Sequence, residues 1–409
     1  MTKRIVLGSF IFAAAALVLF GFWKFHKTAA AATVATAAAR SAPLKYGVWL
    51  PFWRAQSGAS DVSLYLNELS EVSPFSYAIG DGGRKIIDDA HINDGSWNGW
   101  FLAAHQLGVK IIPTVAWFSG QTMYDYLSNT RTRIAQENAI SNLARTQKFD
   151  GIDIDYEAKL PKIKPYFALF IEGLAMRLHA QGKLLTCTVE PRSPATDIWQ
   201  GTPPDPLPYS DNYPAFNKYC DEVRVMAYDQ GNVDLYMNAL KGNGTLYAPT
   251  ADPQWVARVL RETMRWISPK KIMLGVPTYG YEYQVSWKDG VTTYERVRSF
   301  TFLQAMDRAD ILGIAPTRNN AGELSFTYHT STVVTGIPPI LITQVTSTIE
   351  PAALRGPFVG NATNTMFVSF ADSQSAQTEI NLAKQLGLRG VIFFKADGEL
   401  DPAIWGELH

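Results

Sequence analysis

The segment D-G-I-D-I-D-Y-E, residues 150–157, holds four acidic side chains within eight residues. In a β-strand, successive side chains point to opposite faces, so Asp153, Asp155 and Glu157 would share one face and the apolar residues between them the other. Like charges in one row cannot all ionise freely, so we expect at least one raised pKa and one protonated acid near neutral pH. Glu157 ends the row, and catalytic groups in a parallel barrel come from the carboxyl ends of strands, so it is the best candidate for a proton donor.

A calcium-binding loop is the competing interpretation of this acidic segment. An EF-hand loop that began at Asp153 would need glycine at position 158 and glutamate at position 164, where this chain has Ala158 and Lys164. A solvated acidic loop would also not alternate with isoleucine. We therefore interpret the segment as a buried strand that carries a catalytic acid.

Composition limits the class of protein. The 409 residues, 47% of them hydrophobic, suffice for one α/β barrel with additions. Lys plus Arg equals Asp plus Glu at 37 each, so nothing indicates a nucleic acid as partner. The two cysteines, Cys187 and Cys220, are too few for a disulfide framework and have no metal-ligand spacing, so we predict buried free thiols, no metal and no cofactor.

Residues 1–27 predict a targeting segment. An uncharged run, 5–23, lies between basic residues and is close to the length that spans a bilayer, while small residues typical of a signal cleavage site follow at 29–32. We favour an uncleaved signal anchor over a cleaved signal peptide. Either one places the remainder outside the cytoplasm if the amino terminus stays inside, and the alanine-rich residues 28–43 form a linker.

From residue 44 the pattern alternates between strand and helix. Short apolar runs are typical of buried parallel strands. Together with the acidic segment they give eight predicted strands, at 46–53, 72–79, 109–117, 150–157, 184–190, 222–229, 271–280 and 390–396. Helical patterns lie between them at 97–107, 130–147, 166–181, 253–267 and 373–386. This order predicts a (β/α)8 TIM barrel over 44–409, with a doubly wound sheet as the lesser alternative.

One connection is too long for a barrel loop. Residues from about 281 to 370, between strand seven and the next helix, must fold on their own. They contain one short helical pattern, 301–309, and two strand patterns, 323–328 and 365–370. We therefore predict a small α+β insertion at this place.

The acidic motif resembles the signature of glycoside hydrolase family 18, the chitinase-type family. The resemblance covers roughly Tyr46 to Trp405 and includes M-A-Y-D, residues 226–229, which is similar to the family's M-x-Y-D. Three segments look most similar to bacterial cell-wall and spore-cortex-lytic members: 248–256, 275–283 and 370–377. The resemblance also implies an α+β insertion after strand seven.

The resemblance implies substrate-assisted retention, in which the N-acetyl carbonyl of the sugar attacks its own anomeric carbon. Glu157 would protonate the glycosidic oxygen and later activate water. Asp155 would hold the acetamido N–H and stabilise the oxazolinium intermediate, and Asp153 would share charge or a proton with Asp155. Tyr228 would donate a hydrogen bond to the acetamido carbonyl, although a barrel-filling aromatic is its bland alternative. Met226 and Asp229 would line the same pocket.

Other positions are expected sugar contacts with weaker support: Trp53, Arg192, Tyr279, Tyr281 and Trp287. Two positions depart from the family pattern. The family's S-x-G-G on strand three is absent, since residues 116–120 read A-W-F-S-G. Phe394 stands where the family has the tryptophan under the reacting sugar, and phenylalanine covers less of a sugar face.

Together these features predict a glycosidase that cleaves β-1,4 bonds after N-acetylglucosamine in peptidoglycan or chitin. The partner would be an N-acetylglucosamine-containing polysaccharide, with membrane attachment through the amino-terminal segment, and we expect a monomer. A non-catalytic, lectin-like sugar-binding protein on the same fold is the alternative, because a fold alone proves no function. Lectin-like relatives typically lose the catalytic acid, and Glu157 is present here.

Overall fold

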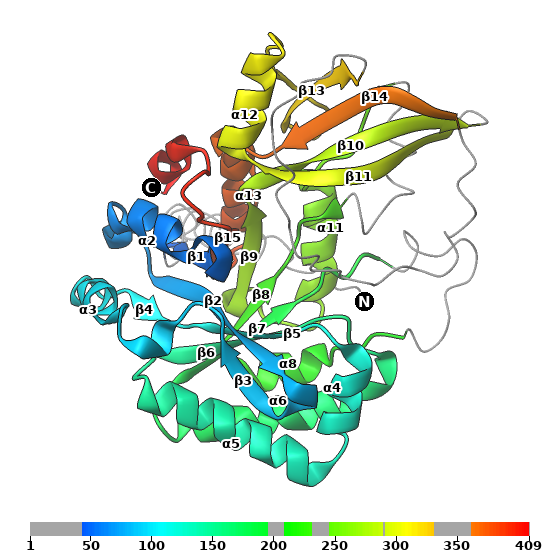
Figure 1. Ribbon diagram of the computed structural model, residues 1–409. Helices are drawn as coiled ribbons and strands as arrows, with labels where there is room; N and C mark the ends of the chain where they lie inside the picture. The colour runs from blue at the N-terminus through cyan, green and yellow to red at the C-terminus, as the bar shows by residue number, and fades with distance from the viewer. Residues whose placement is uncertain (1–42, 195–207, 231–244, 289–290, 331–360, 409) are drawn as a thin grey trace, which may run out of the picture. The chain divides into compact units, whose positions relative to one another are not determined.

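The computed structural model describes residues 43–194, 208–230, 245–288, 291–330 and 361–408 (Figure 1). The predicted targeting segment and most of the linker lie outside these residues. Within the described part of the chain, no helix is both long and apolar enough to cross a bilayer.

A closed barrel of parallel strands forms the centre of the fold. Its strands are β1 (Lys45–Pro51), β2 (Glu71–Gly80), β4 (Lys110–Ile111) with β5 (Thr114–Trp117), β6 (Gly151–Tyr156), β7 (Leu184–Val189), β8 (Glu222–Val225), β9 (Ile272–Pro277) and β15 (Gly390–Phe394). They pair in chain order, and β1 closes the ring because it pairs with both β2 and β15. A short strand, β3 (Lys85–Asp88), adds antiparallel to β2. The (β/α)8 barrel prediction is confirmed.

Helices lie outside the strands (Figure 1). They include α2 (Ala55–Ser63), α3 (Asn98–Gln106), α4 (Gly120–Leu127), α5 (Thr130–Thr146), α6 (Lys164–His179), α8 (Tyr213–Tyr219), α11 (Pro253–Met264) and α13 (Ser373–Gln385). The apolar stripe of α6 explains its position, because Phe170, Ile171 and Leu174 are fully buried against the barrel. Side-chain caps fix several starts: Asn129 accepts from the first turn of α5, Asp252 from that of α11 and Asp372 from that of α13.

The insertion after β9 is an antiparallel sheet with one helix. Its elements are β10 (Tyr279–Lys288), β11 (Val291–Thr301), α12 (Phe302–Ile311), β12 (Thr317–Arg318), β13 (Leu324–His329) and β14 (Asn361–Phe370). The strand order is β11-β10-β14-β13-β12. The sheet begins at Tyr279, directly after β9, so the segment 271–280 that the sequence predicts as one strand belongs to two sheets.

Two predicted barrel strands are shorter than expected. Strand three divides into β4 and β5 around Pro113, because proline has no N–H to donate to a ladder. The predicted strand 222–229 ends at Val225, so Met226 to Asp229 follow it as a loop. Asp229 there has φ +60°, in the left-handed region that a strand excludes.

The prediction of free thiols is wrong. Cys187 and Cys220 form a disulfide with their Cα atoms 6.2 Å apart. Cys187 lies in β7, Cys220 directly follows α8, and the neighbouring strand β8 pairs Val223 with Cys187. The two sulfur atoms meet because β7 and β8 are adjacent in the barrel, which residue spacing alone does not reveal.

Candidate active site

Asp153 lies inside the barrel and is surrounded by hydrogen-bond donors. Its register partners on β5 and β7 are Thr114 and Thr186. Each of these hydroxyl groups donates to the carboxylate at 2.8 Å, and Thr188 Oγ1 lies 3.0 Å from both of its oxygens. The indole Nε1 of Trp49 adds a longer contact of 3.4 Å. These donors fix the Asp153 side chain in one position inside the barrel.

Arg224 of β8 supplies the countercharge. Its Nη1 lies 3.3 Å from Asp153 Oδ2 and donates to Ser73 Oγ at 2.7 Å, while Nη2 donates to Glu71 Oε1 at 2.7 Å. The Arg224 side chain is fully buried. Burial of a charge is tolerated here because it is paired and hydrogen-bonded. The predicted role of Asp153, to share charge or a proton with Asp155, stays a prediction.

Asp155 faces the same interior two residues further along β6. It is 3% exposed, and its Oδ1 has no hydrogen-bond partner among the described residues. Burial, and after it the charge of Asp153, raises the pKa of Asp155 to about 8. With a pKa of about 8, Asp155 is mostly protonated at neutral pH.

Glu157 follows the last residue of β6, and its N–H donates to the carbonyl oxygen of Trp117 at 2.9 Å. The side chain is half-buried, so it remains open to a ligand. Burial raises the pKa of Glu157 well above its ordinary value, and the charges of Asp155, Glu190 and Asp229 raise it further. A glutamic acid in such an environment keeps its proton and can act as a general acid.

A buried lysine, Lys159, lies next to these carboxyl groups and was not predicted as a site residue. Lys159 Nζ lies 3.3 Å from Asp211 Oδ1 and 3.5 Å from Glu190 Oε2, and it donates to the carbonyl oxygen of Tyr156. Its charge opposes the rise in the pKa of both Glu157 and Asp155. Glu190 could have been found, because it directly follows β7 at the barrel end where Glu157 follows β6.

Two tyrosines from the insertion contact Asp229, the last residue of the M-A-Y-D segment. The hydroxyl groups of Tyr279 and Tyr281 each donate to Asp229 Oδ1 at 2.6 Å. Burial raises the pKa of Asp229, against these two hydrogen bonds. The pKa of Tyr228 is raised by burial and then by the charges of Asp155 and Asp229, so the phenol stays a hydrogen-bond donor close to the acidic row. These predicted residues therefore form one cluster with Glu157.

Phe394 joins the same cluster at the end of β15. Its ring stacks on Tyr228 with centroids 5.5 Å apart and 15° between the planes. Trp49 and Tyr279 meet it edge-on at 5.8 and 5.9 Å. Met226, which is 9% exposed, begins the loop that carries Tyr228. Phe394 thus packs within this aromatic cluster, and its predicted role under the reacting sugar stays a prediction.

The three remaining predicted sugar contacts are Trp53, Arg192 and Trp287. Trp53 is 45% exposed in the turn after β1, with its ring 6.3 Å from that of Phe75. The guanidinium of Arg192 lies between the rings of Tyr209 and Tyr213, at 3.9 and 3.6 Å. It also donates to the carbonyl oxygen of Asp211, so its contacts are structural. Trp287 belongs to β10, but its side chain lies outside the described residues.

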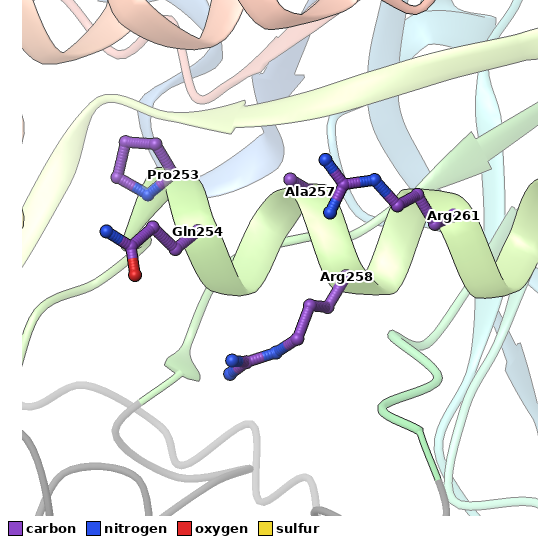
Figure 2. A pocket seen from close by; sticks show the side chains of 5 residues that line it. All are labelled: Pro253, Gln254, Ala257, Arg258 and Arg261. Atoms are coloured by element: carbon purple, nitrogen blue, oxygen red, sulfur yellow. The ribbon is translucent and has the colours of Figure 1, made fainter.

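A hollow opens on the surface of α11. It is lined by Pro253, Gln254, Ala257, Arg258 and Arg261 and contains none of the predicted site residues. Figure 2 shows the guanidinium groups of Arg258 and Arg261 pointing in different directions from the helix. The described residues contain no cluster of three or more His, Cys, Asp or Glu that could hold a metal ion.

Comparison with known proteins shows the family of this chain. The model of glycosyl hydrolases family 18 matches residues 101–399. The uncharacterized glycosylase YvbX of Bacillus subtilis (strain 168) is 25% identical over 213 residues, which cover 52% of this chain and 55% of YvbX. This chain thus spans about half the length of the curated relatives that it matches.

Solved structures share the fold at low sequence identity. The spore cortex-lytic enzyme SleL of Bacillus megaterium QM B1551 is 18% identical with a TM-score of 0.63, over 91% of this chain and 74% of SleL. A family 18 chitinase of Cycas revoluta, solved with (GlcNAc)3, is 15% identical with a TM-score of 0.61, over 89% of this chain and 98% of that one. With the family match over more than half of its length, the chain belongs to glycosyl hydrolases family 18.

Proposed function

We propose that the protein is a glycosidase that cleaves β-1,4 bonds on the reducing side of N-acetylglucosamine by substrate-assisted retention. The pKa of Glu157, raised by burial and by its acidic neighbours, carries the proposal, because the reaction needs a protonated acid near neutral pH. Glu157 gives its proton to the glycosidic oxygen as the bond from the anomeric carbon to that oxygen breaks. It then takes a proton from the water that attacks the same carbon, as the bond between that carbon and the acetamido oxygen breaks and the acetamido group is restored.

Asp155 and Tyr228 serve the acetamido group in this scheme. The acetamido oxygen forms the new bond to the anomeric carbon, so no protein nucleophile is required. Asp155 Oδ1, which has no partner among the described residues, is available to accept the acetamido N–H. The Tyr228 hydroxyl donates to the acetamido oxygen and thereby orients it for attack. Asp155 also stabilises the positive oxazolinium, and Asp153, which lies 3.3 Å from Arg224 Nη1, shares charge or a proton with Asp155.

Peptidoglycan is the favoured substrate, and chitin is the second. The likeness to a Bacillus spore cortex-lytic enzyme supports the first, and the likeness to chitinases supports the second. A location outside the cytoplasm, with the amino-terminal segment as membrane anchor, is supported by the Cys187–Cys220 disulfide, since such bonds persist mainly in oxidising compartments.

A lectin-like protein on the same fold is the alternative, favoured by Phe394 in place of the expected tryptophan. The half-buried Glu157 with its raised pKa favours the enzyme, because binding alone needs no proton donor.

The test is to incubate the full chain with purified peptidoglycan and with chitooligosaccharides, and to analyse the products by mass spectrometry. Muropeptides that end in reducing N-acetylglucosamine support the peptidoglycan enzyme, and cleavage of chitooligosaccharides alone supports a chitinase. Binding of both substrates without cleavage would leave the lectin-like alternative.

A further inference from the structure

Arg296 projects from the insertion next to the acidic cluster. It lies in β11 directly opposite Tyr283 of β10. Its guanidinium carbon is 5.1 Å from the ring centroid of Tyr281, whose hydroxyl group donates to Asp229 Oδ1. The Arg296 charge lowers the pKa of Asp229, and Asp229 in turn raises that of Glu157. Arg296 therefore lies beside the Tyr281–Asp229 hydrogen bond, which belongs to the cluster around Glu157.

The charge of Arg296 is available to a ligand. Its side chain is exposed, and among the described residues no carboxylate forms an ion pair with it. Arg298 on the same strand provides the contrast, because its Nε lies 2.6 Å from Glu282 Oε2 and is neutralised there. Stacking on Tyr281 restricts the Arg296 side chain, so less conformational entropy is lost when it binds an anion.

The Arg296 guanidinium also forms a hydrogen bond with Tyr281, and its exposed charge is what the two candidate glycans would meet differently. Chitin consists of neutral sugars and offers Arg296 no anion. A muramyl sugar carries a lactyl group on O3, which either ends in a free carboxylate or is joined to a peptide with carboxylates of its own. Arginine binds carboxylates through paired, charge-assisted hydrogen bonds, so this side chain suits the muramyl substituent.

We propose that Arg296 is a specificity-determining residue that pairs with a carboxylate on the O3 substituent of a muramyl sugar next to the cleaved bond. The inference rests on the proposed glycosidase function and names the substrate class of that same site. The carboxylate belongs to the lactyl group in strands without peptide and to the stem peptide in strands that carry it.

The test compares Arg296→Gln and Arg296→Lys with the native full chain. Arg261→Gln is the matched control, because Arg261 is an exposed arginine in the hollow of α11. The substrates are chitotetraose and three muramyl strands: peptide-free strands, the same strands with the lactyl carboxylate converted to its methyl amide, and peptide-bearing strands.

In Arg296→Gln, the ratio of kcat/KM for peptide-free strands to kcat/KM for chitotetraose should fall about five- to tenfold, mainly through KM. Arg296→Lys should recover part of this loss, and Arg261→Gln should show none. The native ratio should decrease in high salt, because salt screens exposed charge pairs. If peptide-bearing strands alone respond to Arg296→Gln, the stem peptide supplies the carboxylate.

Equal losses on chitotetraose and on all muramyl strands would overturn the inference, because Arg296 would then only hold Tyr281 in place. Equal rates on the free acid and its methyl amide, with no effect on peptide-bearing strands, would overturn it as well. If no glycan is cleaved, the proposed activity fails by itself. The role of Arg296 is then tested by calorimetry, which measures the affinity of the same strands for Glu157→Gln and for Glu157→Gln/Arg296→Gln. Equal affinities for the two proteins would refute the role of Arg296.

Discussion

Replacement of Asp155 by asparagine should stabilise the protein while it removes activity. Asp155 is buried with a pKa of about 8, against an ordinary value of 3.8. The folded protein must therefore hold a proton that the unfolded chain releases at neutral pH. At pH 7 this costs about 1.36 kcal/mol for each of roughly three pH units, or about 4 kcal/mol. Asparagine is neutral in both states and avoids this cost.

The stability difference between Asp155→Asn and the native chain should depend on pH. A raised pKa means that the contribution of Asp155 to stability is complete below pH 3.8 and is lost as pH rises toward 8. Urea unfolding of the native chain and of Asp155→Asn should therefore give similar free energies near pH 4. Near pH 7 the variant should be more stable by up to about 4 kcal/mol. Equal stability at pH 7, or a gain that is the same at both pH values, would refute the burial argument.

Two further predictions concern the acid and the disulfide. Glu157 must be protonated to act, and its pKa in the folded protein is raised well above 4.5, the ordinary value of glutamic acid. We therefore expect kcat/KM to fall on the alkaline side only well above pH 4.5. Half-loss of kcat/KM near pH 4.5 would contradict this. The double variant Cys187→Ala/Cys220→Ala should have a free energy of unfolding in urea roughly 3–4 kcal/mol below that of the native chain, because it loses a cross-link over 33 residues. An unchanged free energy of unfolding would refute a stabilising disulfide.

Local patterns in the sequence were enough to predict the barrel. The barrel was predicted from the alternating residues 150–157 and from apolar runs that precede helical patterns. Both patterns depend only on residues close together in the chain, and the structure confirms the resulting (β/α)8 order. The predicted strand ends were less accurate where a single residue interrupts or ends a strand. Pro113 interrupts strand three, and the chain leaves β8 after Val225. The hairpin of β10 and β11 was missed because its alternation runs on from β9 with only Thr278 between them.

The parts of the site that come from distant segments could not be predicted in the same way. Lys159 meets Asp211, and Cys187 meets Cys220, only because the barrel brings consecutive strands side by side. The Asp229 hydrogen bonds to Tyr279 and Tyr281 likewise need the insertion to fold against the barrel. Motif residues were therefore found from sequence, whereas the charges that set their pKa values required the structure.

The most direct test of the account is the turnover and glycan binding of Glu157→Gln, with Asp150→Asn as control. Asp150 belongs to the same motif but lies before β6, where it pairs with His105. Glu157→Gln should lose at least about a hundredfold in kcat on peptidoglycan strands or chitotetraose, because the general acid is gone, while affinity stays nearly unchanged. Asp150→Asn should keep its kcat. Turnover by Glu157→Gln close to that of the native chain would contradict the assignment of Glu157 as the catalytic acid.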